Sequence, residues 1–208
     1  MTNTHPSDPT GAQAVLDFWL GDGLRRGWCS DQRDDLWFGG GAELDARIRE
    51  RFGDLVAQAV DGGLRGWEAR IDTRLALVLL LDQFTRNAFR GQARAFAGDP
   101  RAQALVRQAL AEGQDEHLAT VGRVFLYMPL VHAEDLALQD QSVGHFARLC
   151  ETCAPELRET LQRHLHFARL HRDIVLRFGR FPHRNAALGR HSTAEEIAFL
   201  KDGPRFGQ

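Results

Sequence analysis

Hydrophobic residues recur along most of this chain at intervals of three or four positions, the spacing of one face of an α-helix. The pattern is clear from Leu44 to Ala59, where Asp61-Gly62-Gly63 ends it, and again from Pro155 to Phe178, where Gly179 follows. No stretch alternates apolar and polar residues as a half-buried strand does. We therefore expect an all-α protein.

Start and stop signals divide this pattern into about eight helices. The expected helices begin near Asp8, Leu44, Asp72, Asp99, residue 116, Val131, Pro155 and Ser192. Pro129 should kink or break the helix through Val121, and residues 192–196 hold two overlapping capping boxes. Short connections favour stacked antiparallel hairpins, with 100–112 paired to 116–127 and 131–150 paired to 155–178.

The expected helix after Asp72 is apolar on all sides from Leu75 to Leu81, so it should lie at the centre of the fold. Asp82 and Arg86 follow at the i,i+4 spacing of an intrahelical ion pair, flanked by Gln83 and Arg90. A pair on such a helix should be buried. Because a buried ion pair adds little stability, it indicates a site or a fixed geometry.

Composition is that of one globular domain, which we expect to span residues 1–208 with residues 1–9 disordered. The chain has 208 residues, 43% of them hydrophobic, and a formal net charge of -2. No apolar run approaches the roughly 20 residues of a membrane span, and the polar N-terminus resembles no targeting peptide. We expect a cytoplasmic protein with no membrane partner.

The three cysteines do not form a metal pattern. Cys150 and Cys153 have the spacing of a redox motif, but they follow a long helix rather than the strand that precedes a thioredoxin site. Reduced thiols agree with a cytoplasmic location.

Positive charge is concentrated between Arg163 and Arg190. This segment holds seven Arg and four His against one acid, Asp173. Such a surface could attract anions. RNA is not expected as a partner, because Lys201 is the only lysine, the net charge is near zero and no RNA-binding signature is present.

Two histidines, His164 and His171, fall on the apolar face of the helix from Pro155 to Phe178, whereas His166 points away. Buried imidazoles need hydrogen-bond partners. Both could be satisfied core residues, but His171 directly precedes the Arg/His loop and is therefore a catalytic candidate.

A third polar group follows Pro129, in the order His132-Ala-Glu134-Asp135. Glu134 or Asp135 could polarise His132 or His171 for proton transfer, so all four are catalytic candidates. Equally, Asp135 could bond the backbone near the proline. A Zn²⁺ or Mn²⁺ site would combine His132 and Asp135 with His171 or His183. The second His of a zinc-protease helix is missing, so we expect no metal and no cofactor.

The segment Arg177-Phe-Gly-Arg-Phe-Pro-His-Arg-Asn185 reads as a loop anchored by its phenylalanines. Guanidinium groups bind carboxylates and phosphates well, so Arg180, His183, Arg184 and Asn185 join the ligand candidates. Alternatively, these arginines cap helix carbonyls and pair with Asp82, Glu134 and Asp135.

Four motifs in order resemble the DUF924 family of uncharacterised bacterial proteins. They are 81–87 (Leu-Asp-Gln-Phe-Thr-Arg-Asn) with Phe89-Arg-Gly91, Tyr127-Met-Pro-Leu130 with 132–135, 177–185, and Leu188-Gly-Arg190. Thr85 stands where Pro or Ser is expected. The resemblance, from Val15 to Leu200, implies a right-handed superhelix of stacked hairpins like that of tetratricopeptide repeats. It implies no particular reaction.

Two hypotheses about function remain open. The first is a cleft that binds a small phosphate- or carboxylate-bearing ligand, with hydrolytic chemistry as an extension; its ligand-binding candidates are Asp82, Gln83, Arg86, Arg90, Arg180, His183, Arg184 and Asn185. The second is a helical-repeat scaffold that holds a peptide or protein partner and in which these polar motifs are structural.

Overall fold

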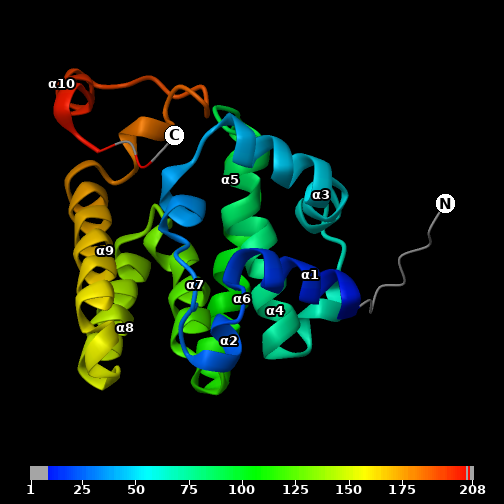
Figure 1. Ribbon diagram of the computed structural model, residues 1–208. Helices are drawn as coiled ribbons and strands as arrows, with labels where there is room; N and C mark the ends of the chain where they lie inside the picture. Colours follow the sequence, from blue (N-terminus) through cyan, green and yellow to red (C-terminus); the bar gives the residue numbers. More distant parts are fainter. Residues whose placement is uncertain (1–8, 205, 207–208) are drawn as a thin grey trace. The chain divides into compact units, whose positions relative to one another are not determined.

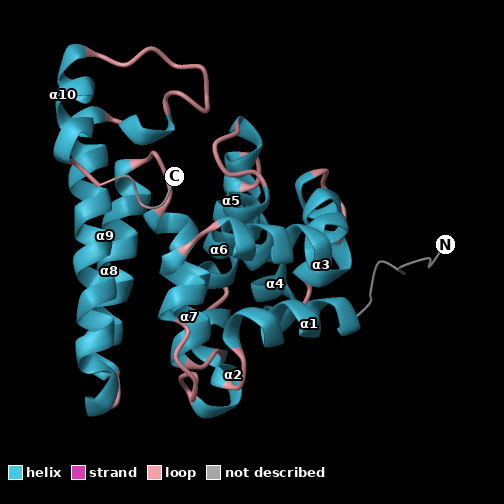
Figure 2. Ribbon diagram, turned by 45° about the horizontal axis from the view of Figure 1, so that its top comes forward, coloured by secondary structure: helices cyan, strands magenta, loops and turns pink. Residues whose placement is uncertain are grey.

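The computed structural model describes residues 9–204 and 206. Every regular element in these residues is helical (Figure 1, Figure 2), which confirms the all-α fold. The described residues form ten α-helices rather than the expected number of about eight, joined by short 3₁₀ and π-helical turns. Two of the ten, α2 (Gly23–Arg26) and α5 (Thr85–Ala88), are single turns. No helix in the described residues is long and apolar enough to cross a membrane.

The chain divides into two compact units. Unit 1 comprises the described residues up to Arg90 together with Arg94–Leu126, and unit 2 comprises Gly91–Ala93 and the described residues from Tyr127 onward. The 3₁₀ turn η4 (Ala93–Phe96) and α7 (Thr120–Val131) have residues in both. The single domain and the superhelix stay predictions.

Unit 1 is built around a continuous helical run. The elements of unit 1 outside this run include α1 (Pro9–Leu20), α2, the π turn η1 (Asp35–Gly39), α3 (Ala42–Val60), the 3₁₀ turn η2 (Arg65–Glu68), α6 (Asp99–Ala111) and the 3₁₀ turn η5 (Gln114–His117). The run itself consists of α4 (Ile71–Val78), the π turn η3 (Leu79–Phe84) and α5. Residues 74–88 are all buried, as expected for a helix that is apolar on all sides.

Packing against this run explains its burial. α1 lies against α4, α3 lies against η3 and α5, and α6 lies against α4 and η3. Phe84 meets the rings of Phe18, Trp19 and Phe52 at centroid distances of 5.8, 5.3 and 5.1 Å. The main contacts of α6 are therefore with the central run, rather than with α7 as its predicted hairpin required.

Unit 2 contains the second part of α7, α8 (Leu136–Thr152), the 3₁₀ turn η6 (Pro155–Leu157), α9 (Arg158–Phe178), the 3₁₀ turn η7 (Pro182–Arg184) and α10 (Ala194–Asp202). α8 and α9 lie side by side (Figure 1, Figure 2), which confirms the second predicted hairpin. Gly179 ends α9 in the left-handed conformation with φ 69°. Thr193 and Glu196 form the predicted capping box of α10.

Some predicted helix boundaries shift. α7 continues through Pro129 to Val131 instead of breaking there, and α8 begins at Leu136 instead of Val131. His132 and Glu134 thus lie in the connection between two helices. α4 begins at Ile71, so Asp72 sits inside its first turn rather than at the cap. Residues 1–8, including the expected cap Asp8, lie outside the described residues, and Pro9 is the first residue of α1.

Candidate functional site

In unit 1, the predicted Asp82–Arg86 pair is present and buried, with 3.3 Å between Arg86 Nη1 and Asp82 Oδ1. Arg86 also donates to both carboxylate oxygens of Asp99, at 2.9 and 3.0 Å, and Gln83 donates to Asp82 at 2.6 Å. Burial alone would lower the pKa of Arg86, but the charges of Asp99 and Asp82 outweigh it and raise that pKa. This pair ties η3 and α5 to the start of α6.

Arg90 is likewise engaged within unit 1. Its Nε and Nη2 donate to the carboxylate of Asp45 at 2.7 and 2.9 Å, and Asn87 donates to the same carboxylate at 3.0 Å. Because Asp45 belongs to α3, this bidentate pair joins the central helical run to α3. The sequence singled out Arg86 and Arg90 but neither of the partners Asp99 and Asp45.

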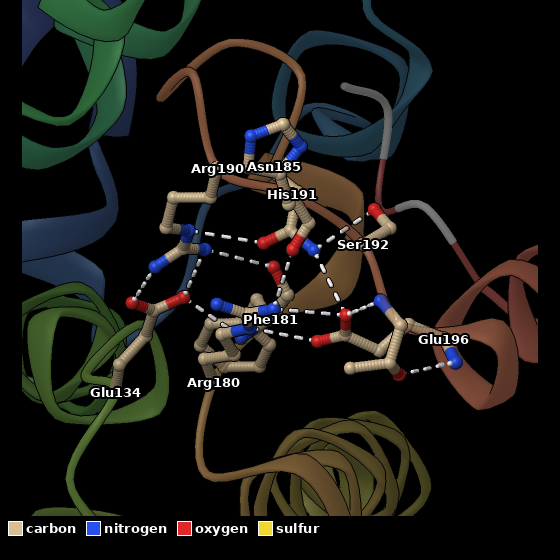
Figure 3. Close-up of polar contacts among 9 residues, drawn as sticks. Glu134, Arg180, Phe181, Asn185, Arg190, His191, Ser192 and Glu196 are labelled. Atoms are coloured by element: carbon tan, nitrogen blue, oxygen red, sulfur yellow. Dashed lines mark hydrogen bonds and ion pairs between the residues drawn. The ribbon is translucent and has the colours of Figure 1, made fainter.

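In unit 2, Glu134 is the centre of a second network (Figure 3). Its carboxylate accepts two guanidinium hydrogen bonds from Arg190, at 2.6 and 2.9 Å, and the backbone N–H of Phe181 at 2.7 Å. Arg190 also donates to the side chain of Asn185 at 2.9 Å. Burial raises the pKa of Glu134, but the Arg190 and Phe181 hydrogen bonds outweigh it, so the net shift is downward. From the sequence, Arg190 was placed in the positive segment and in a family motif, but not among the candidate site residues.

Arg180 is bound to α10 rather than to a ligand. Its Nε and Nη2 donate to the two carboxylate oxygens of Glu196 at 2.7 and 2.9 Å (Figure 3). The same carboxylate accepts the backbone N–H of Thr193 and the side-chain amide of Asn185. The Arg180 hydrogen bond is the main reason why the pKa of Glu196 is lowered to about 2. Glu196 was expected only as a capping residue.

Two histidines and one arginine contact the fully buried ring of Phe181, and a third histidine lies against one of the two. The Phe181 ring lies 5.6 Å from the ring of His171 and 5.5 Å from that of His183, and the Arg184 guanidinium carbon lies 4.5 Å above it. The ring of His132 lies 5.9 Å from that of His171. We call His132, His171, His183 and Arg184 the imidazole cluster. They come from the α7–α8 connection, α9 and η7.

Burial and the surrounding groups keep His171 uncharged. Its Nδ1 donates to the Phe167 carbonyl at 2.7 Å, one turn earlier in α9. Burial lowers the pKa of His171 to about 3, and the positive charges of His132, His183 and Arg184 act in the same direction. The prediction that His171 lies on the core face is confirmed, as it is for His164.

The other predicted members of this region have structural contacts. Arg184 is buried and donates to the His132 carbonyl at 2.9 Å, just after the end of α7. Asp135 is the exposed N-cap of α8 and accepts the backbone N–H of Leu138 at 3.0 Å. These contacts agree with the alternative in which such residues satisfy helix ends. Among the described residues, no three His, Cys, Asp or Glu side chains are grouped as ligands of one metal ion.

Comparison with known proteins gives a family and one similar structure. The family model described as "Bacterial protein of unknown function (DUF924)" matches residues 15–204. The chain is also similar to the solved structure of ATU0120, a protein of unknown function from Agrobacterium tumefaciens. That match has 38% identity and a TM-score of 0.77, covering 94% of this chain and 99% of the other. No curated protein matches. The resemblance predicted from the four motifs is confirmed.

Proposed function

This chain belongs to the DUF924 family of bacterial proteins, whose function is unknown, and we propose that it binds a small anion at the imidazole cluster of unit 2. The ligand is a phosphate- or carboxylate-bearing molecule. One observation carries the proposal: the imidazoles of His171 and His183 and the guanidinium of Arg184 meet at the ring of Phe181, and the imidazole of His132 lies against that of His171.

The electrostatics of this arrangement support an anion. Each group of the cluster either is positive or becomes positive on protonation, and the charges of its neighbours disfavour protonation of His171. An anion placed among them would reverse that effect, because it attracts all four groups at once. Binding near neutral pH should therefore draw protons onto the imidazoles.

The ion pairs narrow the set of ligand residues. Arg180 and Arg190 are each held by a carboxylate, as are Arg86 and Arg90 in unit 1. Those contacts favour a structural role. The proposal is built on His183 and Arg184 because both side chains lie against the Phe181 ring, beside His171. Ligand contact by Asp82, Gln83, Arg86, Arg90, Arg180 and Asn185 stays a prediction.

The proposal is limited to binding. A hydrolytic step would need a general base, and Glu134 is held by two Arg190 hydrogen bonds and a backbone N–H, while Asp135 caps a helix. Catalysis by His132, Glu134, Asp135 or His171 stays a prediction. The scaffold alternative also stays a prediction, favoured by the exposed α9 residues Phe167 and Leu176, which are 50% and 55% exposed.

The test is a phosphate titration at low ionic strength, followed by thermal unfolding and by calorimetry. Wild type is compared with Arg184→Gln, with His183→Ala, and with His166→Ala, an exposed α9 position as the control. We expect phosphate to stabilise wild type and the control, and to stabilise the two cluster variants less. Calorimetry in two buffers of different ionisation enthalpy should show proton uptake on binding.

Equal phosphate responses in wild type and in both cluster variants, with circular dichroism showing all of them folded, would rule out the cluster as the anion site. Two variants are needed because Arg184 is buried and its replacement could disturb the fold. His183 is only partly buried, so His183→Ala tests the site with less risk of disturbing the fold.

A further inference from the structure

A residue from the C-terminal end of the chain covers the imidazole cluster. The ring of Phe206 stacks on the ring of His171, with centroids 3.8 Å apart and planes 24° from parallel. It also meets the His183 ring edge-on at 5.6 Å and 70°. Phe206 therefore contacts two members of the cluster that come from different elements, α9 and η7.

The Phe206 ring occupies a place against the His171 and His183 rings, which we call the slot. Phe181 and Phe206 each contact both His171 and His183. The slot lies against the small apolar core of Ile174, Val175 and Phe181. An imidazole is a good stacking surface, and in the ligand-free protein the lowered pKa of His171 keeps its ring neutral at physiological pH. Aromatic rings are thus favoured here by both shape and charge.

Phe206 occupies its place through a backbone that ordinary residues disfavour. Its φ is 49°, in the left-handed region, where a side chain with a Cβ is crowded. The residue lies in the short segment after α10, which ends at Asp202. Because this conformation costs backbone energy, we expect another aromatic ring to compete with Phe206 for its place on His171.

We propose that the imidazole cluster binds a planar aromatic acid, an aryl carboxylate or aryl phosphate, whose ring takes the place of Phe206 on His171. The acidic group then lies beside His183 and Arg184, the positive end of the slot. This inference rests on the anion site proposed above and adds the class of its ligand. Phe206 acts as an internal competitor for that ligand.

The competition makes the proposal testable with simple probes. Benzoate and phenyl phosphate carry a ring, whereas acetate and inorganic phosphate present the same acidic groups without one. Each is titrated into wild type, Phe206→Ala and Phe206→Leu by calorimetry. The control is Phe199→Ala, because the Phe199 ring meets that of Phe178, with centroids 5.0 Å apart and planes tilted by 53°, and has no ring contact with the cluster among the described residues.

We expect Phe206→Ala to bind benzoate and phenyl phosphate about tenfold more tightly than wild type, which corresponds to about 1.4 kcal/mol of competing stacking. Phe206→Leu should show a smaller gain, and Phe199→Ala none. Acetate and inorganic phosphate should gain little. If the ring-bearing and ring-free anions gain equally, or if Phe206→Ala binds benzoate no better than wild type, the ring slot is rejected while the anion site stands.

A second measurement needs no ligand. Nitrogen-15 NMR of the histidine side chains should show the His171 ring signals shifting in Phe206→Ala, and the pKa of His171 rising toward its ordinary value as the ring becomes exposed. Unchanged His171 signals would show that Phe206 does not cover His171, regardless of the result of the anion titrations. If His171 responds but no anion binds any variant, the anion site itself fails, and the inferred ligand class fails with it.

Discussion

Arg190 donates two hydrogen bonds to the carboxylate of Glu134, at 2.6 and 2.9 Å, across 56 positions of the chain. Glu134 lies between α7 and α8, and Arg190 lies between η7 and α10, so the pair fastens one connection of unit 2 to another. Because Glu134 also accepts the N–H of Phe181, the pair positions the residue whose ring contacts His171, His183 and Arg184.

Arg190→Lys should therefore destabilise the protein by about 1–2 kcal/mol, because an ammonium cannot reproduce the two-pronged contact. Urea unfolding followed by circular dichroism measures the change. Arg177→Lys is the matched control: its pair with Glu195 is exposed, so the change should stay within about 0.5 kcal/mol. Similar losses in both variants would contradict a special role for the Glu134 contact.

Glu196→Gln should cost more, about 2–4 kcal/mol, since the buried carboxylate serves Arg180, Thr193 and Asn185 together. The loss should depend on pH. The pKa of Glu196 is lowered to about 2 in the fold, so its stabilising contribution is full above its ordinary pKa of 4.5 and disappears as pH falls toward 2. The free energies of unfolding of wild type and Glu196→Gln at pH 7 and pH 3 test this. If the two proteins differ by the same amount at both pH values, the prediction is wrong.

His171 should also make the protein sensitive to acid. Whereas Glu196 is needed in its charged form, His171 is buried in its neutral form. Its pKa is lowered to about 3 in the fold, so between pH 6.5 and 3 the unfolded chain binds a proton that the folded chain excludes. The free energy of unfolding therefore decreases as the pH is lowered, by about 1.4 kcal/mol for each pH unit below 6.5.

The measurement is the free energy of unfolding between pH 7.5 and 5 for wild type and His171→Gln. The variant should show the shallower decline, because glutamine takes up no proton. His166→Gln, which changes an exposed histidine of the same helix, should decline as wild type does. Parallel curves for wild type and His171→Gln would exclude His171 as the source of the acid sensitivity.

Local signals account for the parts of the fold that were predicted well. The αL glycine at 179 and the capping box at Thr193 act within a few residues, so the sequence alone locates the ends of α9 and the start of α10. The apolar run from Leu75 to Leu81 likewise indicates central burial. The start of α8 was placed too early because periodicity continued across a turn that the Asp135 cap defines.

The site was predicted less completely, for a physical reason. His171 could be placed on the core face from its helical phase, but the partners Asp99 of Arg86 and Glu134 of Arg190 are fixed by packing between distant segments. An arginine alone does not reveal which carboxylate it meets. Phe206 was missed because no local pattern connects a terminal phenylalanine with His171.

Gly98 gives a sharp test of the packing that holds the Arg86–Asp99 pair. A Cβ there would collide with the carbonyl oxygen of Leu81 and lie 2.9 Å from its carbonyl carbon, both of them backbone atoms of the π turn η3. The Gly98 φ of -81° is ordinary, so the obstacle is this close approach and not backbone conformation. Since η3 carries Asp82 and Gly98 precedes Asp99, any displacement would strain the pair.

Gly98→Ala should therefore destabilise the protein by about 1–3 kcal/mol, the range typical of overpacking. Gly144→Ala is the matched control: a Cβ at this position inside α8 would meet no atom within 4 Å. That change should stabilise the protein by about 0.5–1 kcal/mol, since alanine loses less backbone entropy than glycine in a helix. Urea unfolding of the two variants should give shifts of opposite sign, and a stabilising Gly98→Ala would show that η3 and the start of α6 are farther apart in solution than the structure places them.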